Sequence, residues 1–514
     1  MSIDELPPRD SEDLRRAMRR ASQVAPLAWC AGTRRFNFQA PLTLALPGGG
    51  YALLTVEDGT RYLGQILERE VTERAGPSWT VGVDTSESSQ TERIGEAVVA
   101  MPIRLIEGSG DLLARVDGDE LLPVRSDDAF READLEAAPA ELVAAHAAQR
   151  DSGATVLDVG RAVGDGTGRA RLHAEGFARH TFLCGQSGAG KTFALGVVLE
   201  RLLAQTELRL VILDPNGDYV GLGSTRDADS ADRALLERYR AAGERVSVFS
   251  QDHEPVRLRF GELSRDVRAA VAGLDPLADR EEYSAFVRLA EDRDSLAGLR
   301  DAALSGLSPE GRQIALRIDN LGVAAWNVWA DKGERSVLDA IDGDGRATVI
   351  DLSSLDSPEE QALMAGTVLN HLWKRRTDRR PALVVIDEAH NICPAQGGPP
   401  LEREGRDQVM RIAGEGRKYG LHLLLVTQRP DKLAANALTQ CDNLILMRLN
   451  GAADVERLAA AFSFVPRALV AEAPSFAKGE ALFVGGIVGR PTRAAFEGRL
   501  SPEGGGDLPT DWAR

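Results

Sequence analysis

The chain has few of the residues that a disulfide framework or a zinc site needs. Its 514 residues include only four cysteines, Cys30, Cys184, Cys393 and Cys441, and no two of them form a C-x-x-C pair. Structural zinc sites and disulfide-rich domains both depend on closely spaced cysteines. We therefore expect neither, and the length is ample for two or three domains with a large hydrophobic core.

Long apolar runs and an excess of basic residues are also missing. No run of about 18 apolar residues occurs, and the N-terminus, MSIDELPPRDSEDLRRAMRR, has no apolar core of signal-peptide length. We therefore expect a cytoplasmic protein without a membrane partner. The 61 basic and 78 acidic residues give a net charge of -17, which excludes a generally basic nucleic-acid coat. A ring or cleft can still concentrate Lys and Arg on one inner surface.

A phosphate-binding loop is present. Residues 185–192 read GQSGAGKT and match G-x-x-x-x-G-K-[ST] at every fixed position. They lie between an expected buried strand, Thr181–Cys184, and an expected helix, Phe193–Leu203. In such a loop, backbone N–H groups and the helix dipole face the phosphate oxygens. The residues expected to contact the nucleotide are Gly185, Gln186, Ser187, Gly188, Ala189, Gly190, Lys191, Thr192 and Phe193.

Two further residue sets complete the expected chemistry. Lys191 is expected to place its charge on the β- and γ-phosphates, and the Thr192 hydroxyl to ligate Mg²⁺. The apolar run Leu383–Ile386 is followed by Asp387 and Glu388. At the end of a neighbouring strand, Asp387 would hold Mg²⁺, usually through water, and Glu388 would polarise the attacking water. The sequence therefore predicts an ATP hydrolase with ATP and Mg²⁺ as cofactors.

Two other strand ends carry polar residues. Gln428 ends an apolar run and is expected to contact the γ-phosphate or the water, although it also suits a simple turn before Pro430. Asp214 follows the apolar run Leu208–Leu213. Carboxylates at strand ends face the ligand in open α/β sheets, so Asp214 is a candidate for the same site.

The texture of the chain changes along its length. Short apolar stretches alternate with turn signals from Pro26 to about Val124, which predicts a small all-β barrel. Strands then alternate with helices, which predicts an α/β core with a parallel, doubly wound sheet. The expected division is an N-terminal arm or docking helix at 1–24, a barrel at 25–135, a linker at 136–165, an ATPase core at 166–500 with a helical insertion at 225–344, and a tail at 501–514.

Within the core, apolar runs predict strands and amphipathic runs predict helices. A long helix is expected at Pro358–Lys374, and a turn-rich loop at 394–407, before a helix that ends near Tyr419. The expected strands are 347–352, 382–386, 421–427, 444–448 and a final pair near 479–488.

Taken together, these motifs resemble the HerA branch of the HerA/FtsK superfamily of hexameric DNA-pumping ATPases. The resemblance spans about residues 25–500. Asn216 and Asp218 depart from the family's usual His and Glu but keep size or charge. The matching landmarks are Arg179-His180, GQSGAGKT, LDPNGDY, VVIDEAHNI, Gly416-Arg417-Lys418-Tyr419-Gly420 and VTQRP.

The resemblance implies a RecA-like core, an N-terminal barrel of the HAS type, and a homo-hexamer that threads double-stranded DNA and binds ATP between neighbours. By position, Arg179 looks like the family's trans-acting arginine, Arg417 like a second basic interface residue, and Asp214 like an additional acidic residue. A solvated arginine before a strand is the alternative for Arg179. Arg403 and Arg406 are candidates for DNA contact, although a charged surface loop explains them more simply.

Two functions stay open at this point. The first is an ATP-driven DNA translocase or helicase that works with a NurA-like nuclease in DNA-end processing. The second is an ATPase ring that scaffolds and controls a separate effector, as similar proteins do beside sirtuin-like or nuclease subunits in antiviral defence. The sequence has no nuclease-like acidic cluster outside the ATP site, so either function takes its effector from a partner.

Overall fold

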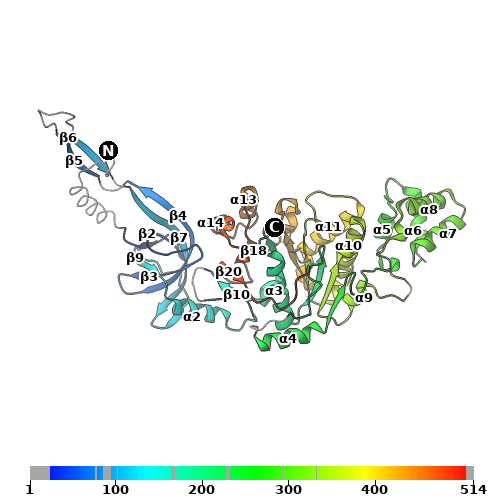
Figure 1. Ribbon diagram of the computed structural model, residues 1–514, viewed down its shortest axis with the longest axis horizontal. Coiled ribbons are helices and arrows are strands. Elements are labelled where there is room, and N and C mark those ends of the chain that lie inside the picture. Colours follow the sequence, from blue (N-terminus) through cyan, green and yellow to red (C-terminus); the bar gives the residue numbers. More distant parts are fainter. Residues whose placement is uncertain are drawn as a thin grey trace, which may run out of the picture. The chain divides into compact units, whose positions relative to one another are not determined.

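The computed structural model describes residues 24–75, 78–84, 94–100, 102–163, 168–226, 232–291, 293–331 and 333–504. The expected N-terminal arm lies almost wholly outside these residues. They form two compact units, whose elements are labelled in Figure 1. One holds the residues up to Arg150 with Pro466–Leu469, and the other holds Asp151–Val163, Gly168–Val465 and the residues from Val470 on. Within the described ranges, none of the helices is long and apolar enough to span a membrane.

The first unit is a closed, antiparallel β-barrel. Its strands are β1 (Leu27–Cys30), β2 (Arg35–Pro41), β3 (Tyr51–Val56), β4 (Arg61–Arg74), β7 (Ile103–Asp117), β8 (Glu120–Leu122) and β9 (Ala133–Ala137). They pair in the order β2-β1-β9-β3-β4-β7-β8, and β2 also pairs with β7, which closes the sheet. Closure removes the open edges that an isolated sheet would expose. The predicted small barrel is therefore confirmed.

Aromatic side chains fill the barrel. The Phe36 and Phe38 ring centroids are 6.3 Å apart, and Tyr62 stacks on Phe130 at 5.8 Å. A side chain at Gly110 would not fit, because its Cβ would lie 2.5 Å from the Phe36 ring. Outside the barrel sheet, β5 (Ser78–Asp84) pairs with β6 (Ile94–Ala100), and helix α2 (Ala140–Asp151) follows β9.

The second unit is built on one 11-stranded sheet with the order β11-β10-β20-β19-β18-β12-β17-β16-β13-β15-β14. Its strands are β10 (Val156–Ala162), β11 (Arg169–His173), β12 (Thr181–Cys184), β13 (Arg209–Asp214), β14 (Val246–Phe249), β15 (Ala347–Asp351), β16 (Ala382–Ile386), β17 (Leu421–Thr427), β18 (Asn443–Met447), β19 (Glu480–Val484) and β20 (Thr492–Phe496). From β18 to β14 all neighbours are parallel. Central strands such as β12, β16 and β17 are buried throughout, as covered parallel strands are.

The prediction that the whole sheet is parallel was wrong for the edge of the sheet beyond β18. There β19, β20, β10 and β11 continue the sheet in antiparallel pairing. The final strand pair was also misplaced, because β20 begins at Thr492, beyond the expected 479–488. Antiparallel neighbours need no crossover helix, so the strand–helix alternation that predicted the parallel core gave no signal for them.

Helices cover the sheet on both faces. They are α3 (Lys191–Gln205), α4 (Arg233–Gly243), α9 (Val337–Asp342), α10 (Pro358–Lys374), α11 (Pro400–Glu415), α12 (Ala435–Thr439) and α13 (Ala452–Ala461). Helix α14 (Arg467–Ala471) follows α13 in the chain, and its residues are divided between the two units. Buried residues of α3 share one core cluster with alternate residues of β12, β13, β16 and β17. The intervening residues of these strands point to the opposite face, and α10 packs against α11 outside that cluster.

The loop expected at 394–407 was placed too far along the chain. Helix α11 already begins at Pro400, so Arg403 and Arg406 lie on a helix rather than in a loop. Arg406 Nε donates to the Pro394 carbonyl at 3.0 Å. Proline lacks an N–H and has a fixed φ, which suits the first helical position. The prolines that indicated a loop therefore start the helix.

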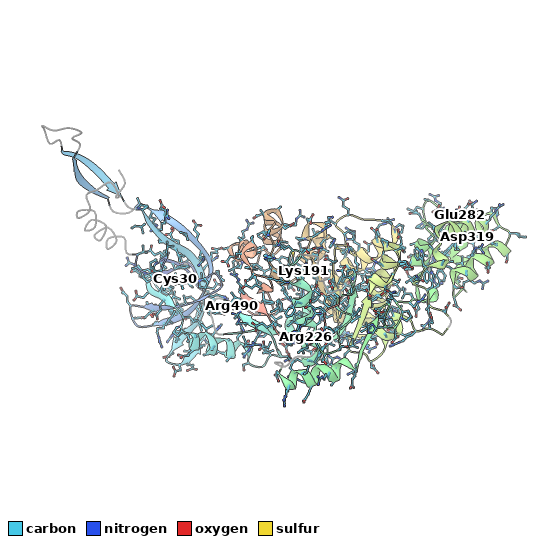
Figure 2. All side chains as sticks on the ribbon, in the orientation of Figure 1. Cys30, Lys191, Arg226, Glu282, Asp319 and Arg490 are labelled. Atoms are coloured by element: carbon cyan, nitrogen blue, oxygen red, sulfur yellow. The ribbon has the colours of Figure 1, made fainter. Side chains whose placement is uncertain are left out.

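A group of short helices follows β14. It comprises α5 (Arg265–Val271), α6 (Arg280–Ala290), α7 (Leu296–Ser305) and α8 (Pro309–Leu321), and α5 contacts α11 (Figure 1). Arg317 of α8 donates to Glu282, labelled in Figure 2, at 2.8 Å and to Asp279 at 2.7 Å. These helices lie within the expected insertion 225–344, as β14 does. Helix α2 and strand β10 lie within the span 136–165. The proposed domain boundaries themselves stay a prediction.

Candidate functional site

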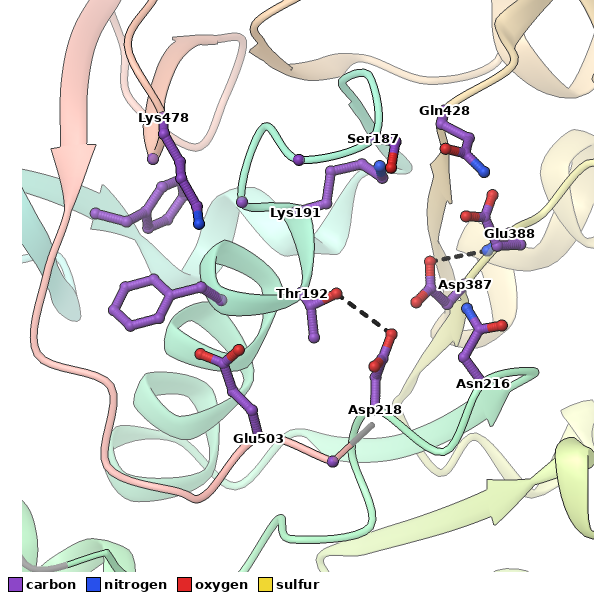
Figure 3. Close-up of a pocket in the computed structure, with 16 residues that line it drawn as sticks. Ser187, Lys191, Thr192, Asn216, Asp218, Asp387, Glu388, Gln428, Lys478 and Glu503 are labelled. Atoms are coloured by element: carbon purple, nitrogen blue, oxygen red, sulfur yellow. Dashed lines mark hydrogen bonds between the residues drawn. The ribbon is translucent and has the colours of Figure 1, made fainter. Parts of the chain in front are cut away.

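A cavity of about 610 Å³ opens at the carboxyl ends of the parallel strands (Figure 3). The first turn of α3 points into it, together with the ends of β13, β16 and β17 and residues from the C-terminal part of the chain. Its lining residues are Ser187, Gly188, Gly190, Lys191, Thr192, Phe193, Asn216, Asp218, Asp387, Glu388, Gln428, Lys478, Gly479, Phe496, Glu503 and Gly504.

The loop between β12 and α3 has the backbone that a phosphate cradle needs. Gly188 and Gly190 have φ angles of 73° and 96°, in the left-handed region that glycine occupies without strain. Gly185 is packed so closely that a Cβ would lie 2.7 Å from the Met447 Cβ. The loop leads into α3 at Lys191, so free N–H groups and the positive end of the helix dipole face the cavity.

Lys191 and Thr192 lie at the centre of the cavity in Figure 3. The Lys191 Nζ donates to the Gln186 carbonyl at 3.2 Å, within its own loop. The Thr192 hydroxyl donates to Asp218 Oδ2 at 3.3 Å. Both expected residues are therefore in place, and Asp218 is a carboxylate beside Thr192 to which the sequence analysis gave no role.

Buried carboxylates gather beside Thr192. Burial raises the pKa of Asp387 to about 7, and the charges of Glu388, Asp214 and Asp218 act in the same direction, against the hydrogen bond from the Glu388 N–H. Burial also raises the pKa of Asp218. For Asp214 burial raises the pKa to about 6, although three backbone N–H groups oppose the shift. The negative charges of these neighbouring carboxylates repel one another, so a cation bound among them would be stabilised.

Mg²⁺ fits this set of oxygen ligands. Among the described residues no group of three or more His, Cys, Asp or Glu forms a metal cage. Mg²⁺ at a nucleotide site needs none, because it keeps waters and takes phosphate oxygens as ligands. The Thr192 hydroxyl and the Asp387 carboxylate are hard oxygen ligands, and the raised pKa of Asp387 is what a nearby cation would lower.

Asp214 does not line the cavity but holds the backbone of the turn beside it. Its side chain is fully buried. Its carboxylate accepts hydrogen bonds from the backbone N–H groups of Asn216 at 3.2 Å, Asp218 at 3.1 Å and Tyr219 at 2.8 Å. It therefore shapes the turn that carries Asn216 and Asp218 into the cavity.

Glu388 has a strained backbone and an unsatisfied side chain. Its φ is 41°, left-handed for a residue with a Cβ, which costs on the order of 1–3 kcal/mol. Within the described residues its buried Oε2 has no hydrogen-bond partner, and the nearest imidazole nitrogen, His390 Nδ1, is 3.4 Å away. That nitrogen bonds instead to Thr427 Oγ1 at 2.9 Å. Glu388 lines the cavity, and a carboxylate there that lacks hydrogen bonds is suited to accept one from water.

Gln428 follows β17 and points into the cavity beside Glu388 (Figure 3). Of the expected site residues, Ser187, Gly188, Gly190, Lys191, Thr192, Phe193, Asp387, Glu388 and Gln428 line this one cavity. Gln186 does not line the cavity, and its side-chain oxygen accepts a hydrogen bond from the Asn450 N–H at 3.1 Å.

Arg179 and Arg417 lie elsewhere. Arg179 precedes β12, and Arg417 belongs to a short 3₁₀ helix, Gly416–Tyr419, that precedes β17. Both contact one carboxylate oxygen of Asp442, Arg179 Nη1 at 3.4 Å and Arg417 Nη1 at 3.0 Å. These residues stand at the amino ends of the parallel strands, whereas the cavity is at the carboxyl ends. The fold therefore keeps both arginines away from their own chain's cavity.

Sequence reasoning missed five residues of the cavity wall that carry polar or aromatic side chains, the first of them Asn216 in the LDPNGDY run. Asp218 lies in the LDPNGDY run, and its position after a strand end was a usable signal. Lys478, Phe496 and Glu503 belong to no motif, and the fold brings them to the cavity from the C-terminal part of the chain.

Comparison with known proteins adds a family and relatives. Residues 157–298 match the family described as "Helicase HerA, central domain". The chain is 25% identical over 366 residues to a protein named a probable helicase in Methanocaldococcus jannaschii, covering 64% of this chain and 68% of that protein. It is 25% identical over 382 residues to the DNA double-strand break repair helicase HerA of Sulfolobus acidocaldarius, covering 69% and 72%.

One solved structure that the chain matches is the bacterial conjugative coupling protein TrwBdeltaN70. It is 14% identical and covers 68% of this chain and 90% of its own, with a TM-score of 0.43. That likeness is too low to bear on the site.

Proposed function

We propose that this chain, whose residues 157–298 match the central domain of helicase HerA, is a P-loop ATPase of the HerA type that couples ATP hydrolysis to movement along double-stranded DNA, as a translocase or helicase. The observation that carries the proposal is the single cavity in which Lys191 and Thr192 face Asp387, Glu388 and Gln428. The similarity to the DNA double-strand break repair helicase HerA supports DNA as the substrate.

The residues have complementary roles in hydrolysis. The N–H groups of the loop and Lys191 hold the β- and γ-phosphates. Thr192 and Asp387 would hold Mg²⁺, which supplies positive charge to the phosphate oxygens when bound. The Glu388 carboxylate orients the attacking water and accepts its proton, while Gln428 fixes the direction of attack. Asp214 and Asp218 position these groups.

The opposite placement of the two arginines supports a shared site. Arg179 and Arg417 cannot reach their own cavity, because they stand at the amino ends of the strands and contact Asp442 there. We therefore propose a homo-hexameric ring in which each ATP lies between two subunits and Arg179 of one subunit stabilises the charge that develops on the neighbour's ATP.

The proposed ring encloses double-stranded DNA and acts with a separate effector. A NurA-like nuclease fits DNA-end processing, and a sirtuin-like effector fits antiviral defence. Both partners follow from the family resemblance and stay predictions. A ring that only scaffolds its effector is the competing outcome of the experiment below.

The ATP hydrolysis rate with and without linear duplex DNA tests the motor. We expect DNA to raise the rate of the wild-type chain, and Lys191→Ala to abolish it under both conditions, because Lys191 is the cation on the phosphates. Lys374→Ala, an exposed change at the end of α10, is the matched control. The scaffold function would be the better account if DNA left the hydrolysis rate unchanged and if the chain failed to displace a protein block bound to the duplex.

A further inference from the structure

The nucleotide cavity has two chemically different ends. In Figure 3, Asp387, Glu388 and Gln428 lie to one side of Lys191 and Thr192, while Lys478 and Glu503 lie to the other. The first side is where the terminal phosphate and the water must be. The sugar and base of a bound nucleotide therefore extend toward Lys478 and Glu503.

The wall at this second end is residues 497–504, here called the C-terminal wall. It is fixed to the phosphate-binding helix by Glu200, a fully buried carboxylate of α3. Glu200 accepts hydrogen bonds from the Leu500 N–H at 2.7 Å, the Ser501 N–H at 2.7 Å and the Ser501 hydroxyl at 2.6 Å. Charged acceptors form the stronger class of hydrogen bond, so the wall is held firmly beside α3.

Arg499 ties the C-terminal wall to the first turn of α3. Its side chain is 1% exposed, and Nη1 donates to the Thr192 carbonyl at 2.9 Å. Gly196 makes the room, since a Cβ there would lie 2.7 Å from the Arg499 guanidinium carbon. The same Nη1 lies 3.5 Å from Glu503 Oε1. Arg499 is thus a positioning residue that sets where Glu503 stands relative to the phosphates.

A second link comes from the other side of the site. The Gly504 N–H donates to the Asp218 carbonyl at 3.1 Å, so the wall is fixed next to the residue whose carboxylate contacts Thr192. Glu503 lies between the two anchors, Arg499 and Gly504. Its carboxylate lines the cavity while its side chain keeps 45% exposure.

The chemistry of Glu503 selects among the groups of a nucleotide. A carboxylate only accepts hydrogen bonds, and the phosphates carry negative charge, so Glu503 cannot bind them. Ribose hydroxyls donate, and a carboxylate that accepts from a ribose hydroxyl is a known way to recognise the sugar of a nucleotide. Phe496, 7% exposed, adds apolar surface at this end of the cavity.

We propose that Glu503 accepts a hydrogen bond from a ribose hydroxyl of the bound nucleotide, so that the C-terminal wall makes the site prefer ribonucleotides to deoxyribonucleotides. This role rests on the proposed function, since it takes as given that the cavity binds ATP. It adds a sugar-recognising residue to the phosphate-binding residues at the other end.

Equilibrium binding of ATP, 2′-deoxy-ATP and 3′-deoxy-ATP to the full chain tests the role of Glu503. We expect the wild-type chain to bind ATP about tenfold more tightly than at least one deoxy analogue, because a charged acceptor loses its donor. Glu503→Ala should weaken ATP binding about tenfold and leave that analogue unchanged, so that the ratio falls to about one. Glu503→Gln keeps an accepting oxygen and should retain part of the preference.

Glu497→Ala is the matched control, since Glu497 belongs to the same wall but pairs with Arg161 and Arg169 outside the cavity. It should keep the wild-type ratio. Equal affinity of the wild-type chain for all three nucleotides overturns the role of Glu503, as does an unchanged ratio in Glu503→Ala. A wild-type chain that binds none of the three contradicts the proposed function itself, whereas the first two results leave it intact.

Discussion

Two features of Glu388 point to one chemical role: its strained φ, and a carboxylate oxygen that has no hydrogen bond among the described residues. Backbone strain persists where the surrounding structure enforces it, and it gathers at functional sites. Glu388→Gln keeps the shape of the side chain but removes the charge that accepts a proton from water. We expect ATP to bind normally and hydrolysis to fall by about 10²- to 10⁴-fold, the usual contribution of a general base.

Single-turnover phosphate release measures this loss directly. Glu359→Gln, an exposed carboxylate in the first turn of α10, is the control and should release phosphate at the wild-type rate. Normal release from Glu388→Gln would assign the base to another residue.

His180 makes stability depend on pH. It is fully buried, its Nδ1 accepts from the Leu423 N–H at 2.9 Å, and among the described residues its Nε2 has no hydrogen-bond partner. Burial, aided by the charge of His422, lowers the pKa of His180 from 6.5 to about 4. In that interval the unfolded chain binds the proton and the folded chain does not, so stability is full above about pH 6.5 and falls toward pH 4.

Urea unfolding across this pH range measures the effect. The shift predicts a loss of up to about 3 kcal/mol from His180. His180→Asn keeps a hydrogen-bond acceptor, cannot be protonated, and should flatten that part of the profile. His253→Asn changes an exposed histidine and should leave the profile as it is. Equal profiles for wild type and His180→Asn would contradict a buried neutral His180.

At the scale of elements, α3 depends on the segment that follows β20. Glu200 of α3 accepts three hydrogen bonds from Leu500 and Ser501 in the interior of the second unit. Glu200→Ala leaves these donors unpaired. It also removes the carboxylate whose Oε1 lies 3.9 Å from Arg499 Nε. We expect the free energy of unfolding to fall by about 3 kcal/mol, as for a broken buried ion pair.

Urea denaturation of the full chain measures that loss, with Glu237→Ala on the exposed face of α4 as the control. A change below about 0.5 kcal/mol, the usual range for an exposed site, would mean that the wall does not depend on Glu200.

The sequence predicted the strands that lead into the motifs, because their residue pattern is local. The strand before Gly185 and the strand before Asp387 are short, wholly buried and followed by their chemical groups at fixed spacing, and their residues are apolar or β-prone, so β12 and β16 were located correctly. The cavity residues near Lys478 and Glu503 could not be found in this way. Phe496 reaches the cavity through the antiparallel register of β19 and β20, in which Glu480 pairs with Ala495, and such a register leaves no local pattern.

At the scale of the whole molecule, the proposed ATP site is divided between copies. Lys191 and Glu388 face one cavity, whereas Arg179 and Arg417 share Asp442 at the opposite edge of the sheet. Arg179→Ala should therefore bind nucleotide and assemble nearly normally, yet lose on the order of 10³ or more in turnover, the range of arginine fingers. A variant with near-normal turnover would exclude this role.

Mixing Arg179→Ala subunits with Lys191→Ala subunits tests the shared site most directly. Each variant alone should be inactive, but a mixed ring contains interfaces that join an intact loop from the first variant to an intact Arg179 from the second. With subunit exchange confirmed by labelled protein, the account predicts that part of the ATP hydrolysis returns. Mixed rings that recover no hydrolysis would contradict it, because Arg179 would then act within its own subunit or only structurally.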